Sequence, residues 1–127
     1  MAAVSPPSET ELELLKLFWR AGDLSAREVQ DQLPAGLDWA VSTTRTVLER
    51  MRIKGLLTRR SVHGMAVYGA ARGKVEVLGA ALRRVMRDVL EVEGRLPAAA
   101  FTGSQVLTRA ELDELVAILN ADAEATK

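Results

Sequence analysis

The chain has 127 residues, of which 48% are apolar and 27% charged, so it can form one domain or two small ones but not a large multidomain enzyme. It has no cysteine and a single histidine, which excludes disulfides, iron–sulfur clusters and the common zinc sites. Aromatic residues make up only 4%, too few for the stacking surfaces of proteins that bind single-stranded nucleic acid. We expect neither a metal nor a cofactor.

The first ten residues have no basic start and no apolar run, so they do not resemble a secretory signal. No window of the sequence approaches the roughly 20 apolar residues that a membrane-spanning helix needs. The sequence therefore predicts a soluble, cytoplasmic protein that does not insert into a membrane.

Three segments begin with a capping box, in which a hydroxyl and a carboxylate three residues later satisfy free N–H groups of the first helical turn. The three pairs are Ser8 with Glu11, Ser25 with Glu28, and Thr108 with Glu111. They predict helices over residues 9–20, 26–33 and 109–120, and Pro34 ends the second of these. The first helix is expected to bury Leu12, Leu15, Phe18 and Trp19.

A further helix is predicted over residues 42–54, ended by Gly55. Helical spacing puts one set of side chains on its inner face, namely Thr44, Val47, Leu48 and Met51. The opposite face carries Ser42, Thr46, Glu49 and Ile53, flanked by Thr43, Arg45 and Arg50. Trp39, in the loop before this helix, is interpreted as a lid on the core.

Two strand-like runs, residues 57–62 and 65–68, flank His63-Gly64, which suits a tight hairpin turn. His63 is interpreted as a turn residue and not as a ligand or base. The stretch from residue 39 to residue 60 is strongly basic although the whole chain has no net charge. Its charged residues are Arg45, Arg50, Arg52, Lys54, Arg59 and Arg60 against Glu49 alone. Charge concentrated in this way favours binding to phosphate.

After residue 72 the pattern becomes helical again. Apolar residues recur at alternating spacings of three and four, which is the rhythm of a helix that packs against another helix. These residues are Val75, Leu78, Leu82, Val85, Val89 and Val92, and the last helix adds a stripe of Leu112, Leu115, Val116 and Leu119. A small dimer interface, or packing against the first domain, explains this pattern. We therefore expect two domains, residues 1–72 and 73–127.

The order helix, helix, basic helix, basic hairpin describes a winged helix-turn-helix, so the predicted fold is mainly α with a small β-hairpin wing and a C-terminal helical region. In this fold the third helix enters the major groove of DNA, which is about 12 Å wide. We expect base-edge contacts from Ser42, Thr43, Arg45 and Thr46, and contact with either a base or a phosphate from Arg50. Lys54, Arg59 and Arg60 are expected to bind phosphates.

Two other classes remain open at this point. One is a winged-helix adaptor that binds proteins and not DNA, and the other is a MarR-like regulator that senses a ligand. An enzyme is excluded, because a single histidine in a turn provides no nucleophile with a base and an orienting group. The glycine-rich residues 69–74 do not have the spacing of a phosphate-binding P-loop and lack a Ser or Thr after the lysine.

The pattern of the first domain is carried by residues 11–19, 24–29 and 38–57, and by the position of Tyr68 in the hairpin. On these residues, the stretch 8–72 resembles the BlaI/MecI/CopY family of bacterial repressors. The family pattern W-x-x-x-T-x-x-T-x-L-x-R-x-x-x-K-G is matched by Trp39, Thr43, Thr46, Leu48, Arg50, Lys54 and Gly55.

This resemblance implies a repressor that binds a two-fold symmetric operator as a homodimer and controls a resistance or stress gene such as a β-lactamase. It places the dimer contacts in the C-terminal helical region. There the apolar periodicity offers Val75, Leu78, Leu82, Val85, Val89, Leu112, Leu115 and Leu119. Members that respond to β-lactams act with a membrane-bound sensor protease and are inactivated by cleavage of an Asn-Phe bond. The matching bond here is Ala100–Phe101, where the Asn is absent. Copper-sensing members carry C-terminal cysteine pairs, which this chain lacks.

Overall fold

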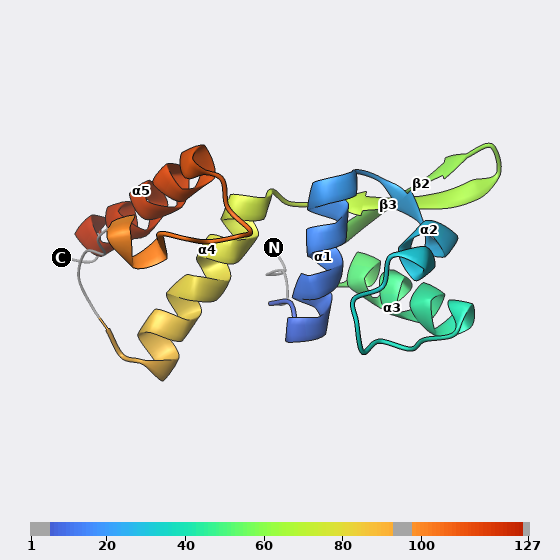
Figure 1. The fold of residues 1–127 in the computed structure, drawn as a ribbon, viewed down its shortest axis with the longest axis horizontal. Coiled ribbons are helices and arrows are strands. Elements are labelled where there is room, and N and C mark those ends of the chain that lie inside the picture. The colour runs from blue at the N-terminus through green and yellow to red at the C-terminus, as the bar shows by residue number, and fades with distance from the viewer. Residues whose placement is uncertain (1–5, 93–97, 126–127) are drawn as a thin grey trace. The chain divides into compact units, whose positions relative to one another are not determined.

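The computed structural model of the chain describes residues 6–92 and 98–125. The chain divides into two compact units, residues 1–73 and residues 74–127. The expected boundary lay after residue 72, and the structure divides the chain after Gly73. The described part of the first unit contains three helices and a small sheet, and the described part of the second unit contains helices (Figure 1).

The helices of the first unit are α1 (Glu9–Ala21), α2 (Ala26–Asp31) and α3 (Val41–Ile53). Ser8 Oγ accepts a hydrogen bond of 3.1 Å from the N–H of Glu11, whose Oε1 accepts one of 2.9 Å from the N–H of Ser8. Ser25 and Glu28 form the same arrangement at the start of α2. Both predicted capping boxes are therefore present. The second helix ends two residues earlier than predicted, because Gln32 leaves the helical conformation at φ −120°.

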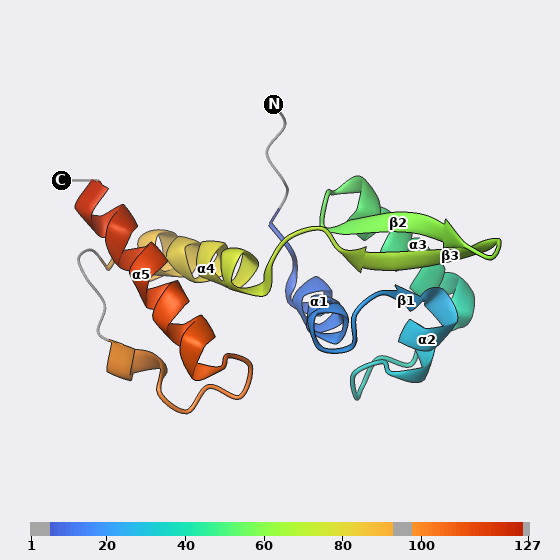
Figure 2. The ribbon, with the colours of Figure 1, turned by 90° about the horizontal axis from the view of Figure 1, so that it is seen from above.

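The sheet has three antiparallel strands in the order β1-β3-β2, with β1 (Leu24–Ser25), β2 (Leu57–Val62) and β3 (Met65–Ala70). His63 and Gly64 join β2 to β3 with φ values of 52° and 78°, so both turn residues have the positive φ that a tight hairpin turn requires. Figure 2 shows β1 alongside this hairpin. The hairpin was predicted, whereas β1 was not, because a strand of two residues has no periodicity to detect.

The core of the first unit joins side chains from all three helices. Its most deeply buried members are Leu14, Leu15, Val29, Thr44, Leu48 and Met51. In α1 the predicted burial of Leu15 and Phe18 is confirmed. Leu12 and Trp19, however, are only half-buried, and Leu14 and Leu17 are buried in addition. Trp19 instead anchors the end of the unit, because its indole N–H donates a hydrogen bond of 3.1 Å to the carbonyl of Arg72.

The second unit contains α4 (Lys74–Arg84), a π-helical turn η1 (Val85–Val89), a 3-10 helix η2 (Ala98–Phe101) and α5 (Arg109–Ala125). Thr108 and Glu111 cap α5 as predicted. Helices α4 and α5 pack around a buried cluster of Val75, Leu115 and Leu119, against which Leu82, Phe101, Leu107 and Ile118 are partly buried. Gly79 allows this close packing, since a Cβ there would lie 3.2 Å from Leu115.

The residues predicted for dimerisation fall into two groups within a single chain. Val75, Leu112, Leu115 and Leu119 are buried in the core of the unit. Leu78 and Leu82 are half-buried. By contrast, Val85 and Val89 on η1 are 42% and 69% exposed, and Leu90 beside them is 59% exposed. Among the described residues of this unit, the exposed large apolar side chains therefore gather in η1 and just after it, at Val85, Val89, Leu90 and Val92.

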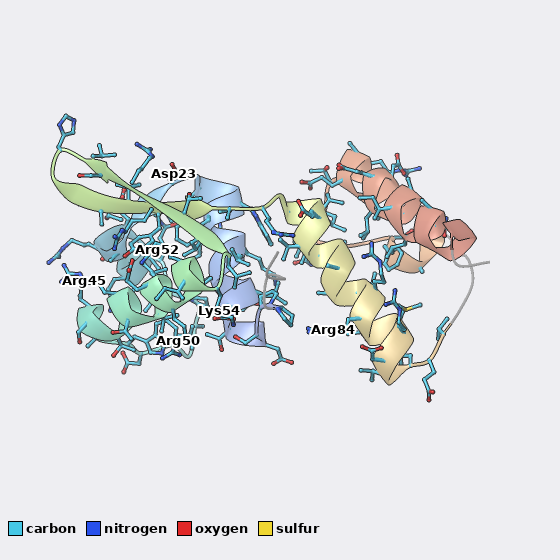
Figure 3. The ribbon with its side chains drawn as sticks, turned by 180° about the vertical axis from the view of Figure 1, so that it is seen from behind. Asp23, Arg45, Arg50, Arg52, Lys54 and Arg84 are labelled. Carbon is cyan, nitrogen blue, oxygen red and sulfur yellow. The ribbon has the colours of Figure 1, made fainter. Side chains whose placement is uncertain are left out.

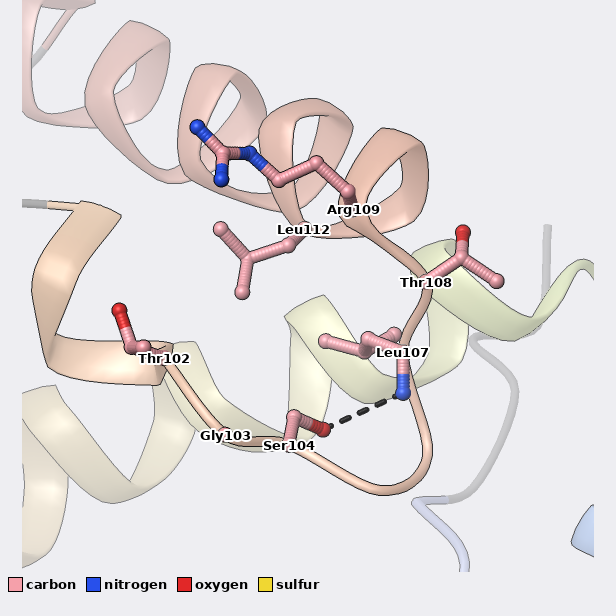
Figure 4. A pocket seen from close by; sticks show the side chains of 7 residues that line it. All are labelled: Thr102, Gly103, Ser104, Leu107, Thr108, Arg109 and Leu112. Atoms are coloured by element: carbon pink, nitrogen blue, oxygen red, sulfur yellow. Dashed lines mark hydrogen bonds between the residues drawn. The ribbon is translucent and has the colours of Figure 1, made fainter.

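The second unit also has a hollow of about 410 Å³ (Figure 4). It is lined by Thr102, Gly103, Ser104, Leu107, Thr108, Arg109 and Leu112. Two of its hydroxyls hold the local turn, because Ser104 Oγ accepts from the N–H of Leu107 at 3.2 Å and Thr108 Oγ1 accepts from the N–H of Glu111 at 3.2 Å. The turn into α5 therefore accounts for two of the three hydroxyls that line this hollow.

Candidate nucleic-acid interface

The outward face of α3 carries the residues predicted to contact bases. Ser42, Thr43, Arg45, Thr46 and Arg50 are all exposed, while Thr44, Leu48 and Met51 on the opposite face are buried. The Thr46 hydroxyl donates a hydrogen bond of 3.0 Å to the Ser42 carbonyl, which leaves the oxygen free to accept from a partner. The predicted division of this helix into a buried and an exposed face is therefore observed.

Two arginines on α3 have no acidic partner within residues 6–92 and 98–125. Neither Arg45 nor Arg50 forms an ion pair with any residue that the structure describes. Figure 3 shows both beside the ribbon of α3, whereas Arg52 lies between this helix and the hairpin. A guanidinium group without a carboxylate keeps all five N–H donors available for a base or a phosphate.

The first turn of α3 is also open to an incoming acceptor. Its N-cap residue is Ala40, which has no side chain able to cap, and the structure gives the helix no side-chain cap. The free N–H groups of such a turn are satisfied by water or by a ligand, and they carry a partial positive charge. The start of α3 is therefore suited to a position close to phosphate or to base edges.

Gln30 fixes α3 against α2. Its side-chain oxygen accepts a hydrogen bond from the Thr44 hydroxyl, and its amide N–H donates to the carbonyl of Trp39. Thr44 is fully buried, so this hydrogen bond satisfies a hydroxyl that water cannot reach. Gln30 was not identified from the sequence, because its partners lie 9 and 14 residues away along the chain.

Glu49 joins α3 to the hairpin. It accepts a hydrogen bond of 2.6 Å from the Tyr68 hydroxyl on β3 and forms ion pairs of 3.0 Å with Arg52 and 2.9 Å with Arg59 on β2. The hydrogen bond from Arg52, followed by the one from Tyr68, lowers the pKa of Glu49 to about 2. As the single acid in the basic stretch, Glu49 could have been recognised from the sequence as a partner for the nearby arginines.

The other predicted phosphate ligands are also paired. Lys54 Nζ lies 2.6 Å from Glu11 Oε1, and Arg60 Nη2 lies 3.0 Å from Asp23 Oδ2. Burial by itself raises the pKa of Glu11. The hydrogen bonds from Lys54 and Ser8 together lower the pKa by more than burial raises it, so the net pKa is below the usual value. Each of these cations would therefore have to leave or share a carboxylate in order to bind a phosphate.

Two shallow depressions adjoin on the outward face of α3. One, of about 500 Å³, is lined by Arg45, Thr46, Glu49, Arg50, Ile53 and Lys54. The other, of about 380 Å³, is lined by Trp39, Ser42, Thr43, Thr46, Val47 and Arg50. Trp39, interpreted as a lid on the core, is half-buried and also lines the second depression. The interface therefore includes the apolar residues Trp39, Val47 and Ile53 beside its hydroxyls and arginines.

Within residues 6–92 and 98–125, no cluster of three or more acidic, histidine or cysteine side chains is arranged to hold a metal ion. In the same residues, no helix is both long enough and apolar enough to cross a bilayer.

Comparison with known proteins identifies the family. The family model described as penicillinase repressor matches residues 7–121. The methicillin resistance regulatory protein MecI of Staphylococcus aureus is 22% identical over 113 residues, which cover 89% of this chain and 92% of that protein. An uncharacterised 16.5 kDa protein of Latilactobacillus sakei is 24% identical over 114 residues, covering 90% of this chain and 78% of that protein.

Solved structures agree with the fold. The solution structure of monomeric BlaI of Bacillus licheniformis in complex with the blaP half-operator is 26% identical, with a TM-score of 0.50, over 60% of this chain and 93% of that one. A MarR family protein of Bacillus stearothermophilus has a TM-score of 0.52 over 97% of this chain and 78% of that one, and at 18% identity it is a likeness of fold alone. The predicted winged helix is thereby confirmed.

The family match spans both units of the chain, and the family is one of repressors, so the prediction that the protein is not an enzyme is confirmed as well. On the evidence of residues 7–121, this chain belongs to the penicillinase repressor family.

Proposed function

We propose that this protein is a transcriptional repressor that binds a two-fold symmetric promoter operator as a homodimer. The observation that carries the proposal is the outward face of α3, where Arg45 and Arg50 have no ion-pair partner among the described residues. The BlaI structure supports it, because that relative was solved in complex with a half-operator.

The residues of this interface are suited to two kinds of contact with DNA, one to base edges and one to phosphates. Arg45 can hold the O6 and N7 atoms of guanine, while Ser42, Thr43 and Thr46 offer hydroxyls to base edges and the Thr methyl groups fit thymine. Arg50, one turn further along α3, binds a base or a phosphate. Lys54, Arg59 and Arg60 provide phosphate contacts, in exchange for their present carboxylate partners.

A homodimer supplies the specificity that one winged helix lacks. A single unit makes few base contacts, whereas in a dimer the second binding event is nearly intramolecular. Two copies related by two-fold symmetry would place their α3 helices in major grooves about 10 bp apart or a multiple of this distance. The exposed side chains of Val85, Val89 and Leu90 are the apolar surface that we assign to the subunit contact.

We further propose that the regulated gene is a resistance or stress gene such as a β-lactamase, since named relatives are a methicillin resistance regulator and a penicillinase repressor. Induction would dissociate the dimer into its subunits. The cause would be an effector, or a membrane-bound sensor protease that cuts at Ala100–Phe101. Phe101 is partly buried against the cluster of Val75, Leu115 and Leu119, so a cut there would leave Val75 on one fragment and the other members of the cluster on the second.

The deciding experiment is a fluorescence-anisotropy titration of the protein with its own upstream region and with an unrelated duplex, at two salt concentrations. We expect tighter binding to the upstream region and a stoichiometry of two chains per operator. Failure to bind either duplex at low salt would overturn the proposal in favour of a protein-binding adaptor. Binding that a small molecule abolishes without any cleavage would support the MarR-like alternative over protease control.

A further inference from the structure

An ion pair crosses the entire sheet of the first unit. Asp23 lies between α1 and β1, at one edge of the sheet, and Arg60 lies on β2 at the other edge. Asp23 Oδ2 accepts hydrogen bonds from Arg60 Nε at 3.1 Å and from Arg60 Nη2 at 3.0 Å. The central strand β3 runs between them, so these two side chains meet above a strand to which neither belongs.

Gly69 on β3 makes this crossing possible. Leu24 pairs with Tyr68 in the antiparallel register, so Asp23, one residue earlier, lies beside Gly69. A Cβ atom on Gly69 would lie 2.3 Å from Asp23 Oδ1, which is closer than real Cβ atoms approach a neighbour. Gly69 is not among the glycines with positive φ, so space for the Asp23 carboxylate, and not backbone conformation, accounts for the absence of a side chain.

The pair occupies an edge of the Arg60 guanidinium that a phosphate would otherwise use. Nε and Nη2 are the two donors that guanidinium groups commonly present in bidentate contacts with carboxylate and phosphate oxygens. In this structure both donors point at Asp23. A DNA phosphate must therefore displace the carboxylate, or accept the less favourable remaining edge beside a negative charge.

The ion pair between Asp23 and Arg60 is expected to have a modest effect on the affinity for DNA. The side chains of Arg60 and Asp23 are 62% and 46% exposed, so water and salt screen the interaction. Exposed pairs of this kind shift an equilibrium by about two- to five-fold. Such a shift tunes the affinity for DNA without abolishing it.

We propose that Asp23 competes with DNA phosphates for Arg60 and thereby weakens binding to DNA of every sequence. This inference rests on the proposed function, since it assigns a role to Asp23 within the same DNA interface. The competition lowers only the part of the affinity that comes from the wing (β2, β3 and their turn) and leaves the base contacts of α3 unchanged. Asp23 thus lowers the affinity for the operator and for other sequences by the same factor, and the ratio between the two is unchanged.

The test is a double-mutant cycle of Asp23→Asn and Arg60→Gln, measured by anisotropy with an unrelated duplex at low salt. Asp23→Asn is expected to tighten binding by about two- to five-fold in the wild-type background. The matched control is Asp38→Asn, which removes the same charge from an exposed residue that forms no ion pair with a described residue. In the Arg60→Gln background, Asp23→Asn should produce no more gain than this control.

An equal gain from Asp23→Asn in both backgrounds, or a gain no larger than that of Asp38→Asn, would overturn the inference, because the effect would then be one of net charge. Gly69→Ala tests the same contact without a change of charge, and its folded state is checked by circular dichroism. A folded Gly69→Ala protein should bind the unrelated duplex more tightly, and binding identical to wild type would contradict the role of the crossing. If the wild type binds no duplex at all, the proposed function itself fails.

Discussion

The hydroxyl of Tyr68 in the wing donates a hydrogen bond of 2.6 Å to Glu49 on α3. Tyr68 is buried, so replacing it with Phe removes a hydrogen bond to a charged acceptor while keeping the packing of the ring. We expect Tyr68→Phe to lower the free energy of unfolding by about 1–2 kcal/mol, measured by urea denaturation. Ser61→Ala, at an exposed position of β2, is the control and should have little effect. Equal stability of wild type and Tyr68→Phe would show that the contact adds nothing.

The lowered pKa of Glu49 predicts that the stability of the protein depends on pH. Its folded-state pKa of about 2 lies below the usual value of 4.5, because Arg52, Tyr68 and Arg59 stabilise the carboxylate. A lowered pKa contributes stability that is complete above the unfolded value and is lost as the pH falls through the folded value. The free energy of unfolding should therefore decrease between pH 4.5 and about 2. Glu49→Gln should flatten this decrease and Glu13→Gln should not, so superimposable profiles of the two variants would contradict the assignment.

The exposed face of α3 predicts a loss of specificity on mutation. Arg45→Ala or Thr46→Ala should cost about 1–3 kcal/mol of binding to the upstream region and little on an unrelated duplex, because base contacts discriminate between sequences. The measurement is anisotropy with both duplexes. Arg20→Ala, on α1, is the control for the loss of one exposed positive charge. If both duplexes weaken equally, Arg45 and Thr46 contact phosphates only.

The buried hydrogen bond between Thr44 and Gln30 should stabilise the packing of α2 on α3. Thr44→Val keeps the shape of the side chain but leaves the Gln30 oxygen without its donor. We expect a loss of about 1–3 kcal/mol in the free energy of unfolding. Thr43→Val, at an exposed position next to it, should be nearly neutral. In a Gln30→Leu background the effect of Thr44→Val should shrink, and additive effects would argue against a direct bond.

The two groups of apolar residues in the second unit should respond differently to a charge. Val89→Glu changes a side chain that is 69% exposed, so the chain should fold normally and become monomeric, as measured by light scattering. Leu115→Glu changes a buried side chain and should unfold the second unit, as measured by circular dichroism. A Val89→Glu protein that remains dimeric would move the subunit contact elsewhere.

The local features of this protein were predictable from its amino-acid sequence. The capping boxes of Ser8 and Ser25, the turn at His63-Gly64 and the two faces of α3 each depend on residues within one or two turns of each other, and all are present in the structure. The winged-helix fold followed from their order. Local chemistry was sufficient because a cap or a tight turn satisfies its backbone groups with neighbours in the chain.

Which basic side chains remain available, and which apolar side chains remain exposed, depends on contacts between distant parts of the chain. Arg60 and Asp23 are 37 residues apart in sequence, and they meet because β1 and β2 flank the same central strand at Gly69. Likewise Val75 and Val89 follow one periodic pattern, yet α5 covers the first and leaves the second in solvent. Periodicity indicates which face of a helix is apolar, but burial and charge pairing depend on what the fold brings against that face.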